Sequence, residues 1–223
     1  MHSILNRLFF ISLFALFTGC QSSRNLKDGE TVILLADLLD SPLEGVSFSG
    51  EPQRIVDPKV GPAVLFDGVN DAIFVEQNPL AGLTEFTVEI IFRPDAGGSD
   101  EPRFFHVGTV SKDRMMVETR NAEGTWALDS FFRHGEDYLV LLDNDKRHPL
   151  GEWAHLAIVM NDGVVRNYVN GQLELEGELE FQPIDSGGMS IGVRMNKVHW
   201  FKGAIHSIRI KPRTLAPSAF TLR

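Results

Sequence analysis

The feature that most constrains the fold is a succession of short β-rich runs, separated by Gly, Pro, Asn and Asp, between residues 63 and 210. No segment beyond Thr31 shows the 3.6-residue apolar period of an amphipathic helix. Short strands with a turn signal about every 8–12 residues are typical of two packed antiparallel sheets. The chain therefore predicts an all-β sandwich or jelly roll, with strands at residues 63–66, 72–75, 86–93, 103–110, 115–120, 125–132, 138–142, 153–160, 164–169, 172–176, 189–193 and 204–210.

Two turns give the pairing in the middle of the chain. Residues 161–163 (Asn-Asp-Gly) and 170–171 (Asn-Gly) each join two β-rich runs. These residue types adopt the positive φ angles that tight hairpin turns require. We expect three antiparallel strands in sequence between residues 153 and 176.

The N-terminus has the composition of a secretory signal peptide. Arg7 precedes an apolar run at residues 8–17, which is too short to span a bilayer, and the small residues Thr18 and Gly19 follow it. The ending Phe17-Thr18-Gly19-Cys20 resembles the lipobox of bacterial lipoproteins. That resemblance implies that residues 1–19 are removed and that Cys20 is diacylated. The alternative is an ordinary signal peptide with an incidental cysteine.

Residues 20–30 are then the lipidated N-terminus and a tether, and residues 31–223 are one domain. Cys20 is the only cysteine, so no intramolecular disulfide can form. Gln21 stands where an inner-membrane retention signal would place Asp, which favours the outer membrane. We expect a lipid-anchored, extracytoplasmic protein of the cell envelope.

The charge of the chain argues against nucleic acid as a partner. The formal net charge is −9, and no run of Lys or Arg exceeds two residues. Binding to a phosphate backbone needs a basic stripe.

Five segments resemble, in order, those of laminin G-like jelly-roll domains in the concanavalin A-like lectin/glucanase superfamily. They are residues 66–75 (FDGVNDAIFV), 83–94 (LTEFTVEIIFRP), 151–157 (GEWAHLA), 168–171 (YVNG) and 201–210 (FKGAIHSIRI). The resemblance covers about residues 62–220 and implies a sandwich of two curved antiparallel sheets. It does not select among lectins, adhesion modules, glycosidases and polysaccharide lyases, which share this fold.

Polar side chains that alternate with apolar ones along three strands are candidate ligand-binding residues. If these strands are neighbours in the concave sheet, five side chains converge: Glu89, Arg93, Glu118, Arg120 and Asp129. Carboxylates and guanidinium groups bind sugar hydroxyls, and an aromatic side chain (Phe131, Trp126 or Trp200) can cover the sugar ring. The alternative is cross-strand ion pairing on a solvated sheet.

A polysaccharide-active enzyme is the alternative function, and the sequence favours a binding module over it. Glycoside hydrolysis needs two carboxyl groups about 5–10 Å apart, and Glu89 with Glu118 is the candidate pair. The E-x-D-x-x-E strand of the superfamily's retaining glucanases is missing. Arg120, Tyr138 and His155 are compatible in type with a lyase, but their spacing does not select them.

Calcium is the one candidate cofactor that the sequence offers. Asp67, Asn70 and Asp71 supply oxygen ligands in one loop, and many relatives hold a calcium ion at the rim of the sandwich. Asp-Gly and Asn-Asp are also ordinary turn formers, and His206 stands where the family has Asp. The histidines lack the spacing of a zinc site.

The sequence thus predicts a membrane-anchored binding module for a glycan or a surface protein. A polysaccharide-active enzyme and a structural envelope protein remain the alternatives. The partners expected are a carbohydrate or surface protein, and the membrane through Cys20.

Overall fold

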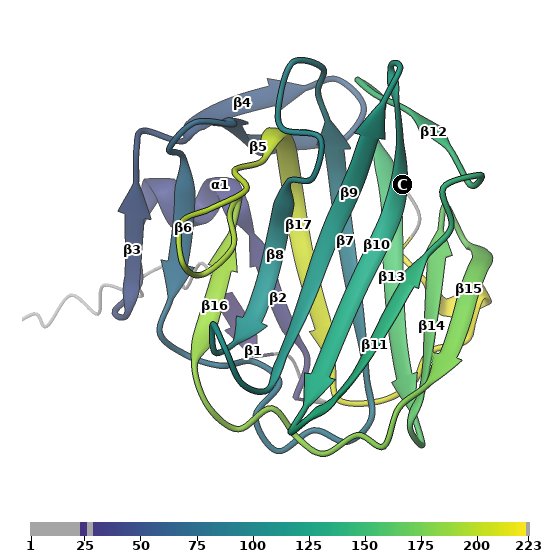
Figure 1. Ribbon diagram of the computed structural model, residues 1–223. Coiled ribbons are helices and arrows are strands. Elements are labelled where there is room, and N and C mark those ends of the chain that lie inside the picture. Colours follow the sequence, from purple (N-terminus) through teal and green to yellow (C-terminus); the bar gives the residue numbers. More distant parts are fainter. Residues whose placement is uncertain (1–22, 26–28, 222–223) are drawn as a thin grey trace, which may run out of the picture.

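The twelve strands expected from the sequence all form, and they divide between two stacked antiparallel sheets (Figure 1). The computed structural model describes residues 23–25 and 29–221. The all-β sandwich fold is confirmed. The expected signal peptide and Cys20 lie outside the described residues.

One sheet has nine strands, with β17 and β7 at its centre. On the edge of β17 that faces away from β7, its first half pairs with β5 and its second half pairs with β2. The strands are β1 (Ser23–Asn25), β2 (Thr31–Leu34), β4 (Gln53–Asp57), β5 (Gly61–Asp67), β7 (Phe86–Pro94), β13 (Ala154–Asn161), β14 (Val164–Val169), β15 (Gln172–Glu178) and β17 (Lys202–Lys211).

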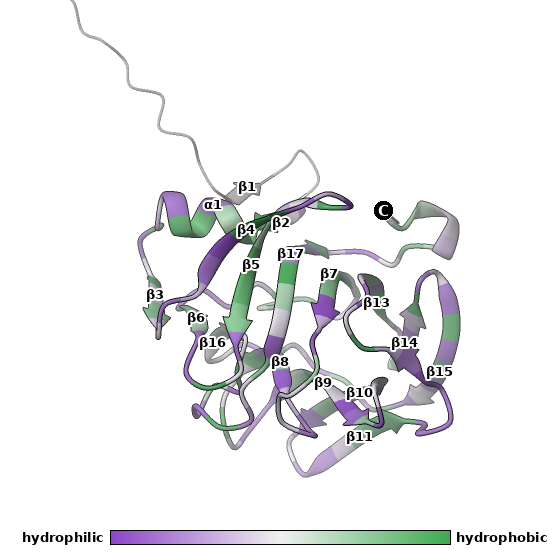
Figure 2. Cartoon of the chain, turned by 90° about the horizontal axis from the view of Figure 1, so that it is seen from above, coloured by the Kyte–Doolittle hydropathy of each residue, from purple (hydrophilic) through white to green (hydrophobic). Residues whose placement is uncertain are grey.

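The other sheet has eight strands in the order β11-β10-β9-β8-β16-β6-β3, and β12 pairs with the start of β10. These strands are β3 (Val46–Ser49), β6 (Ala72–Val75), β8 (Arg103–Gly108), β9 (Arg114–Ala122), β10 (Thr125–His134), β11 (Asp137–Leu142), β12 (His148–Pro149) and β16 (Gly188–Ile191). Figure 2, seen from above, shows the two layers.

The core lies between the layers and follows the two-residue period of the strands. Phe86, Val88, Ile90 and Phe92 of β7 all point into it, as the alternation predicted. Phe92 stacks on Phe104 of the facing sheet, with 4.6 Å between ring centroids. Each strand therefore presents its other face outward.

Most of the elements that sequence analysis did not predict lie in the N-terminal part. The helix α1 (Leu35–Asp40) buries Leu35, Ala36 and Leu38, and a short helix η1 (Pro217–Ala219) lies near the C-terminus. Strand β1, in the segment expected as a tether, pairs with β2. Among the described residues, no helix is long and apolar enough to cross a membrane.

The two predicted hairpin turns are confirmed. Asn170 and Gly171 have φ angles of 50° and 80°, and Asp162 and Gly163 have 51° and 75°. The Asp162–Gly163 turn joins β13 to β14, and the Asn170–Gly171 turn joins β14 to β15, both in antiparallel register. Positive φ at both central residues matches the right-handed twist of the strands, which explains the Asn-Gly and Asp-Gly pairs.

Candidate functional site

Three of the five predicted ligand-binding residues converge on the outer face of the eight-stranded sheet, which we call the ligand face. Glu118 and Asp129 are direct cross-strand partners, and Arg120 extends from the same side of β9. Glu89 and Arg93 lie on β7 in the other sheet. The prediction of one five-residue cluster is wrong, because alternation gives the face of a strand but not the sheet to which it belongs.

The converging residues form a closed carboxylate–arginine network. Arg103 Nε donates to Glu118 Oε1 at 2.9 Å, and Arg120 Nε donates to Asp129 Oδ2 at 2.8 Å. Arg120 Nη2 also lies 3.3 Å from Glu118 Oε2, and its Nη1 lies 2.6 Å from Glu101 Oε2. Two arginines therefore hold two adjacent carboxylates.

The carboxylates in this network are sealed from solvent. The side chains of Glu118 and Asp129 are each 2% exposed, whereas that of Arg120 is 24% exposed. Burial raises the pKa of both carboxyl groups, and the neighbouring arginines oppose that shift only in part. The network positions Arg120 at the surface rather than offering free carboxylates to a substrate.

An aromatic pair, Phe131 and Tyr138, lies on the same face. The two rings are parallel within 13°, with centroids 6.1 Å apart, and Tyr138 is 66% exposed. The guanidinium carbon of Arg114 lies 4.7 Å from the centre of the Phe131 ring. Trp126, another predicted aromatic candidate, is buried in the core and cannot contact a ligand, while Trp200 is half-buried after β16.

Sequence analysis missed Arg103, Arg114 and Arg194 on this face. The signal for Arg114 was available, because it continues the alternation of Met116, Glu118 and Arg120 by one step. A register shift between Arg103 and Phe105 hides Arg103 from that pattern. Arg194 comes from the loop after β16, where no strand period applies.

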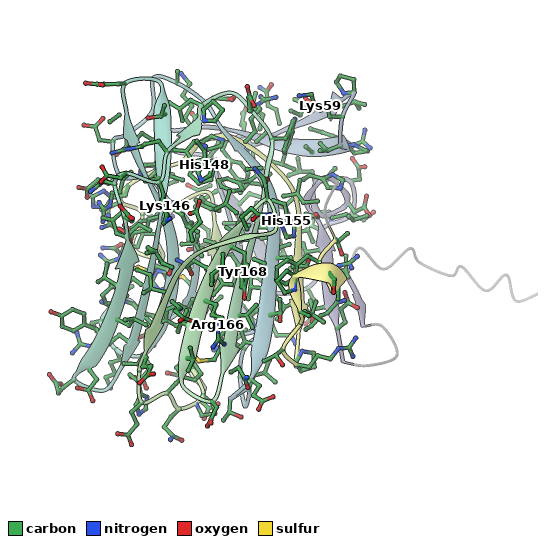
Figure 3. All side chains as sticks on the ribbon, turned by 90° about the vertical axis from the view of Figure 1, so that its right-hand side faces the viewer. Lys59, Lys146, His148, His155, Arg166 and Tyr168 are labelled. Carbon is green, nitrogen blue, oxygen red and sulfur yellow. The ribbon has the colours of Figure 1, made fainter. Side chains whose placement is uncertain are left out.

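Glu89 belongs to a buried pair on the outer face of the nine-stranded sheet. His155 Nε2 lies 3.0 Å from Glu89 Oε2, and the backbone N–H of Thr221 donates to the same oxygen at 2.6 Å. Burial raises the pKa of Glu89, but hydrogen bonds from His155 and Thr221 outweigh it, so the net pKa is lowered. Figure 3 shows His155 and Tyr168 beside the yellow C-terminal segment that covers them.

Arg93 is occupied by ion pairs on the same side of the molecule. Its Nε donates to Asp95 at 2.8 Å, and its Nη1 lies 3.4 Å from Asp57. Its guanidinium also lies 5.4 Å from the ring centre of Trp153. The alternative expected from the sequence, ion pairing on a sheet surface, describes Arg93.

The two catalytic arrangements considered from the sequence do not form. Glu89 and Glu118 point away from the core on opposite sheets, and stacked sheets are themselves about 10 Å apart. They are therefore not a glycosidase pair. His155 likewise lies on the sheet opposite Arg120 and Tyr138, so these three residues do not assemble a lyase site.

The predicted calcium loop uses its carboxylates as backbone acceptors. Asp67 Oδ1 accepts the N–H groups of Val69, Asn70 and Asp71 at 2.8–3.1 Å. Asp71 accepts N–H groups from Glu51 and Asp67. No group of three or more His, Cys, Asp or Glu side chains suited to a metal ion occurs among the described residues. The geometry is that of a turn, and calcium is not proposed.

Comparison with known proteins gives one family match. The model of the concanavalin A-like lectin/glucanases superfamily matches residues 67–219. No curated protein matches the chain by sequence.

Solved structures with the same fold include three proteins of low identity. Domain 4 of AbnA, a GH43 extracellular arabinanase from Geobacillus stearothermophilus in complex with arabinotriose, has a TM-score of 0.60 and 21% identity, over 78% of this chain and 84% of that one. The CBM40 of the Ruminococcus gnavus IT-sialidase, bound to α2,3-sialyllactose, has a TM-score of 0.51 and 15% identity, over 76% and 94%. The binding domain of botulinum neurotoxin serotype D has a TM-score of 0.60 and 14% identity, over 78% and 44%.

Proposed function

Because the chain belongs to the concanavalin A-like lectin/glucanases superfamily, we propose that it is a glycan-binding module that uses its ligand face. The observation that carries the proposal is the aromatic pair beside the carboxylate–arginine network. An exposed aromatic ring covers the apolar side of a sugar, while fixed guanidinium groups donate hydrogen bonds to its oxygens. Tyr138 supplies the exposed ring, and the guanidinium of Arg114, whose carbon lies 4.7 Å from the centre of the Phe131 ring, lies beside the aromatic pair.

Two of the structural neighbours support a carbohydrate ligand. The arabinanase domain binds arabinotriose, and the CBM40 binds sialyllactose. Neither ligand is transferred to this chain, because identities of 21% and 15% establish the fold alone. The buried state of Glu118 and Asp129 favours binding over hydrolysis.

A glycan array with the full-length protein tests the proposal. We expect binding to at least one glycan class and a loss of about tenfold or more in affinity for Tyr138→Ala, since burying a ring-sized apolar surface contributes about 1.5–3 kcal/mol. Tyr138→Phe retains the ring and most of the affinity. Val56→Ala, an exposed position on the nine-stranded sheet, is the control. Absence of binding across the array overturns the proposal.

We further propose that lipidated Cys20 holds the module on the extracytoplasmic side of a membrane, the outer membrane in a two-membrane cell. The support is the sequence of residues 1–21. In the producing bacterium, an alkyne-labelled fatty acid should label the protein and leave Cys20→Ser unlabelled and in the soluble fraction. Membrane retention of Cys20→Ser contradicts the anchor, and separation of the two membranes tests the choice between them.

A further inference from the structure

Arg114 lies on the ligand face with a nearly buried guanidinium and without an ion-pair partner among the described residues. It is 8% exposed, its Nη1 donates to Lys112 O at 2.8 Å, and its Nε is enclosed without a hydrogen-bond partner. It forms no ion pair with any residue that the structure describes, whereas Arg103 and Arg120 on the same face are paired. A buried cation without an anion is costly in free energy.

The surroundings of Arg114 add positive charge. Burial lowers the pKa of Arg114 first, Arg194 and Arg133 lower it further, and Glu118 on the same face opposes them only in part. Arg194 donates from Nη2 to Val110 O at 3.0 Å, and its Nε is also enclosed without a partner. Two arginines thus reach the turn between β8 and β9, and the Nε–H group of each has no hydrogen-bond acceptor.

The local backbone fixes Arg114 in place. Gly108, at the end of β8, has a φ of 107°, and a Cβ there would lie 2.4 Å from Asp113 O. Only glycine allows the turn to close so tightly. Arg114 is the next residue after Asp113 and pairs with Gly108 across the two strands. Its guanidinium lies over the ring of Phe131. The guanidinium is therefore preorganised beside the aromatic pair.

We infer that the glycan bound at the aromatic pair is acidic and that its carboxylate is received by Arg114, with Arg194 as the second cation. This inference rests on the proposed function and names the class of its ligand, a sugar such as a uronic or sialic acid. The planar fork of guanidinium donors suits a carboxylate. General attraction of polyanions does not account for such binding, because the whole chain carries a net charge of −9.

Titration calorimetry with matched ligands tests the carboxylate. The probes are an oligogalacturonide, a hyaluronan oligosaccharide and sialyllactose, each beside its carboxyl-reduced form, together with a sulfated oligosaccharide. We expect the full-length protein to bind at least one carboxylated probe about tenfold or more tightly than its reduced form, the effect of one charge-assisted hydrogen bond. Equal affinity for the two forms, or preference for the sulfated probe, overturns the inference.

Variants locate the site. Arg114→Gln should reduce affinity for the carboxylated probe about tenfold and leave the reduced form unaffected. If Arg114→Gln does not fold, as judged by circular dichroism, the more exposed Arg194→Gln takes its place with a smaller loss. Arg166→Gln is the control, because Arg166 lies on the other sheet, where it pairs with Glu176 (Figure 3). An equal loss for Arg166→Gln overturns the assignment.

The outcomes separate the two proposals. Binding of neutral glycans through Tyr138, without preference for carboxylated ones, overturns the acidic ligand and leaves the glycan-binding module intact. Failure to bind any glycan, acidic or neutral, overturns both.

Discussion

His106 lies under the ligand face and is held in its neutral form. Its side chain is fully buried, its Nε2 lies 3.0 Å from Thr109 O, and its Nδ1 accepts the backbone N–H of Met195 at 3.4 Å. Since a carbonyl oxygen only accepts, the proton lies on Nε2. Burial lowers the pKa of His106 to about 4, and nearby arginines act in the same direction.

This depressed pKa predicts acid sensitivity. Between pH 6.5 and 4 the unfolded chain binds a proton at residue 106 that the folded protein does not, so the free energy of unfolding decreases as pH falls through that window. The full loss from this group is about 3 kcal/mol. Urea unfolding at a series of pH values should show a shallower decline for His106→Gln. The control His206→Gln should keep the wild-type slope, and an unchanged slope in His106→Gln contradicts the assignment.

At the residue scale, alternation predicted which side chains share a face but not their partners. Glu118, Arg120 and Asp129 were placed together because each lies at an outward position of neighbouring strands. Arg103 and Arg194 were not, because one follows a register shift and the other is in a loop. Burial of the carboxylates depends on contacts between distant segments, which the local sequence does not encode.

At the element scale, the C-terminal segment covers the nine-stranded sheet after β17. Phe220 contacts Tyr168 edge-to-face with 5.1 Å between ring centroids, and Leu215 packs against the same small cluster. Thr87 Oγ1 donates to Arg213 O and accepts the N–H of Leu215. The segment thus seals the Glu89–His155 pair.

Removing the Phe220 ring should therefore destabilise the fold. Phe220→Ala deletes a mostly buried aromatic side chain, and we expect the free energy of unfolding to fall by about 3 kcal/mol. Urea unfolding followed by circular dichroism measures the loss. Val69→Ala, at a 68% exposed loop position, should change the unfolding free energy by no more than about 0.5 kcal/mol. A similar small change for Phe220→Ala would show that the segment is not packed in solution.

The elements that could be predicted are those with a complete local signal. The Asn-Gly and Asp-Gly turns fix the β13–β14–β15 meander through backbone conformation alone. Strands β3 and β12 carry no clear alternation, because they are edge or two-residue strands defined by their neighbours. Helix α1 spans only six residues, which is under two turns and too short to show a helical period.

At the scale of the whole molecule, the two-layer fold was predictable and the division of strands between the layers was not. Consecutive strands β7 and β8 belong to different sheets, whereas β8, β9, β10 and β11 follow one another in the same sheet. Short turns predict pairing, but the longer connection after β7 is compatible with either layer. Glu89 and Arg93 were misplaced for this reason.

The first strand also shortens the expected tether. Because β1 begins at Ser23, only residues 21 and 22 separate the proposed anchor Cys20 from a paired strand. Even fully extended, the three residue steps from Cys20 to Ser23 span about 10 Å. Strand β1 belongs to the nine-stranded sheet, while the aromatic pair lies on the outer face of the other sheet. The anchored domain would then meet only ligands that approach the bilayer closely.

A spacer tests this restriction on reach. In vesicles carrying the lipidated protein, a 20-residue Gly/Ser insertion after Gln21 adds a root-mean-square reach of about 25 Å. We expect stronger capture of glycan-coated beads, whose large surfaces approach the bilayer poorly, and unchanged affinity for a soluble oligosaccharide, which diffuses to the ligand face in either protein. A Tyr138→Ala variant with the same spacer should capture fewer beads than the spacer protein with Tyr138, in line with its weaker glycan binding. Equal capture with and without the spacer would mean that the short connection to Cys20 does not limit access to the ligand face.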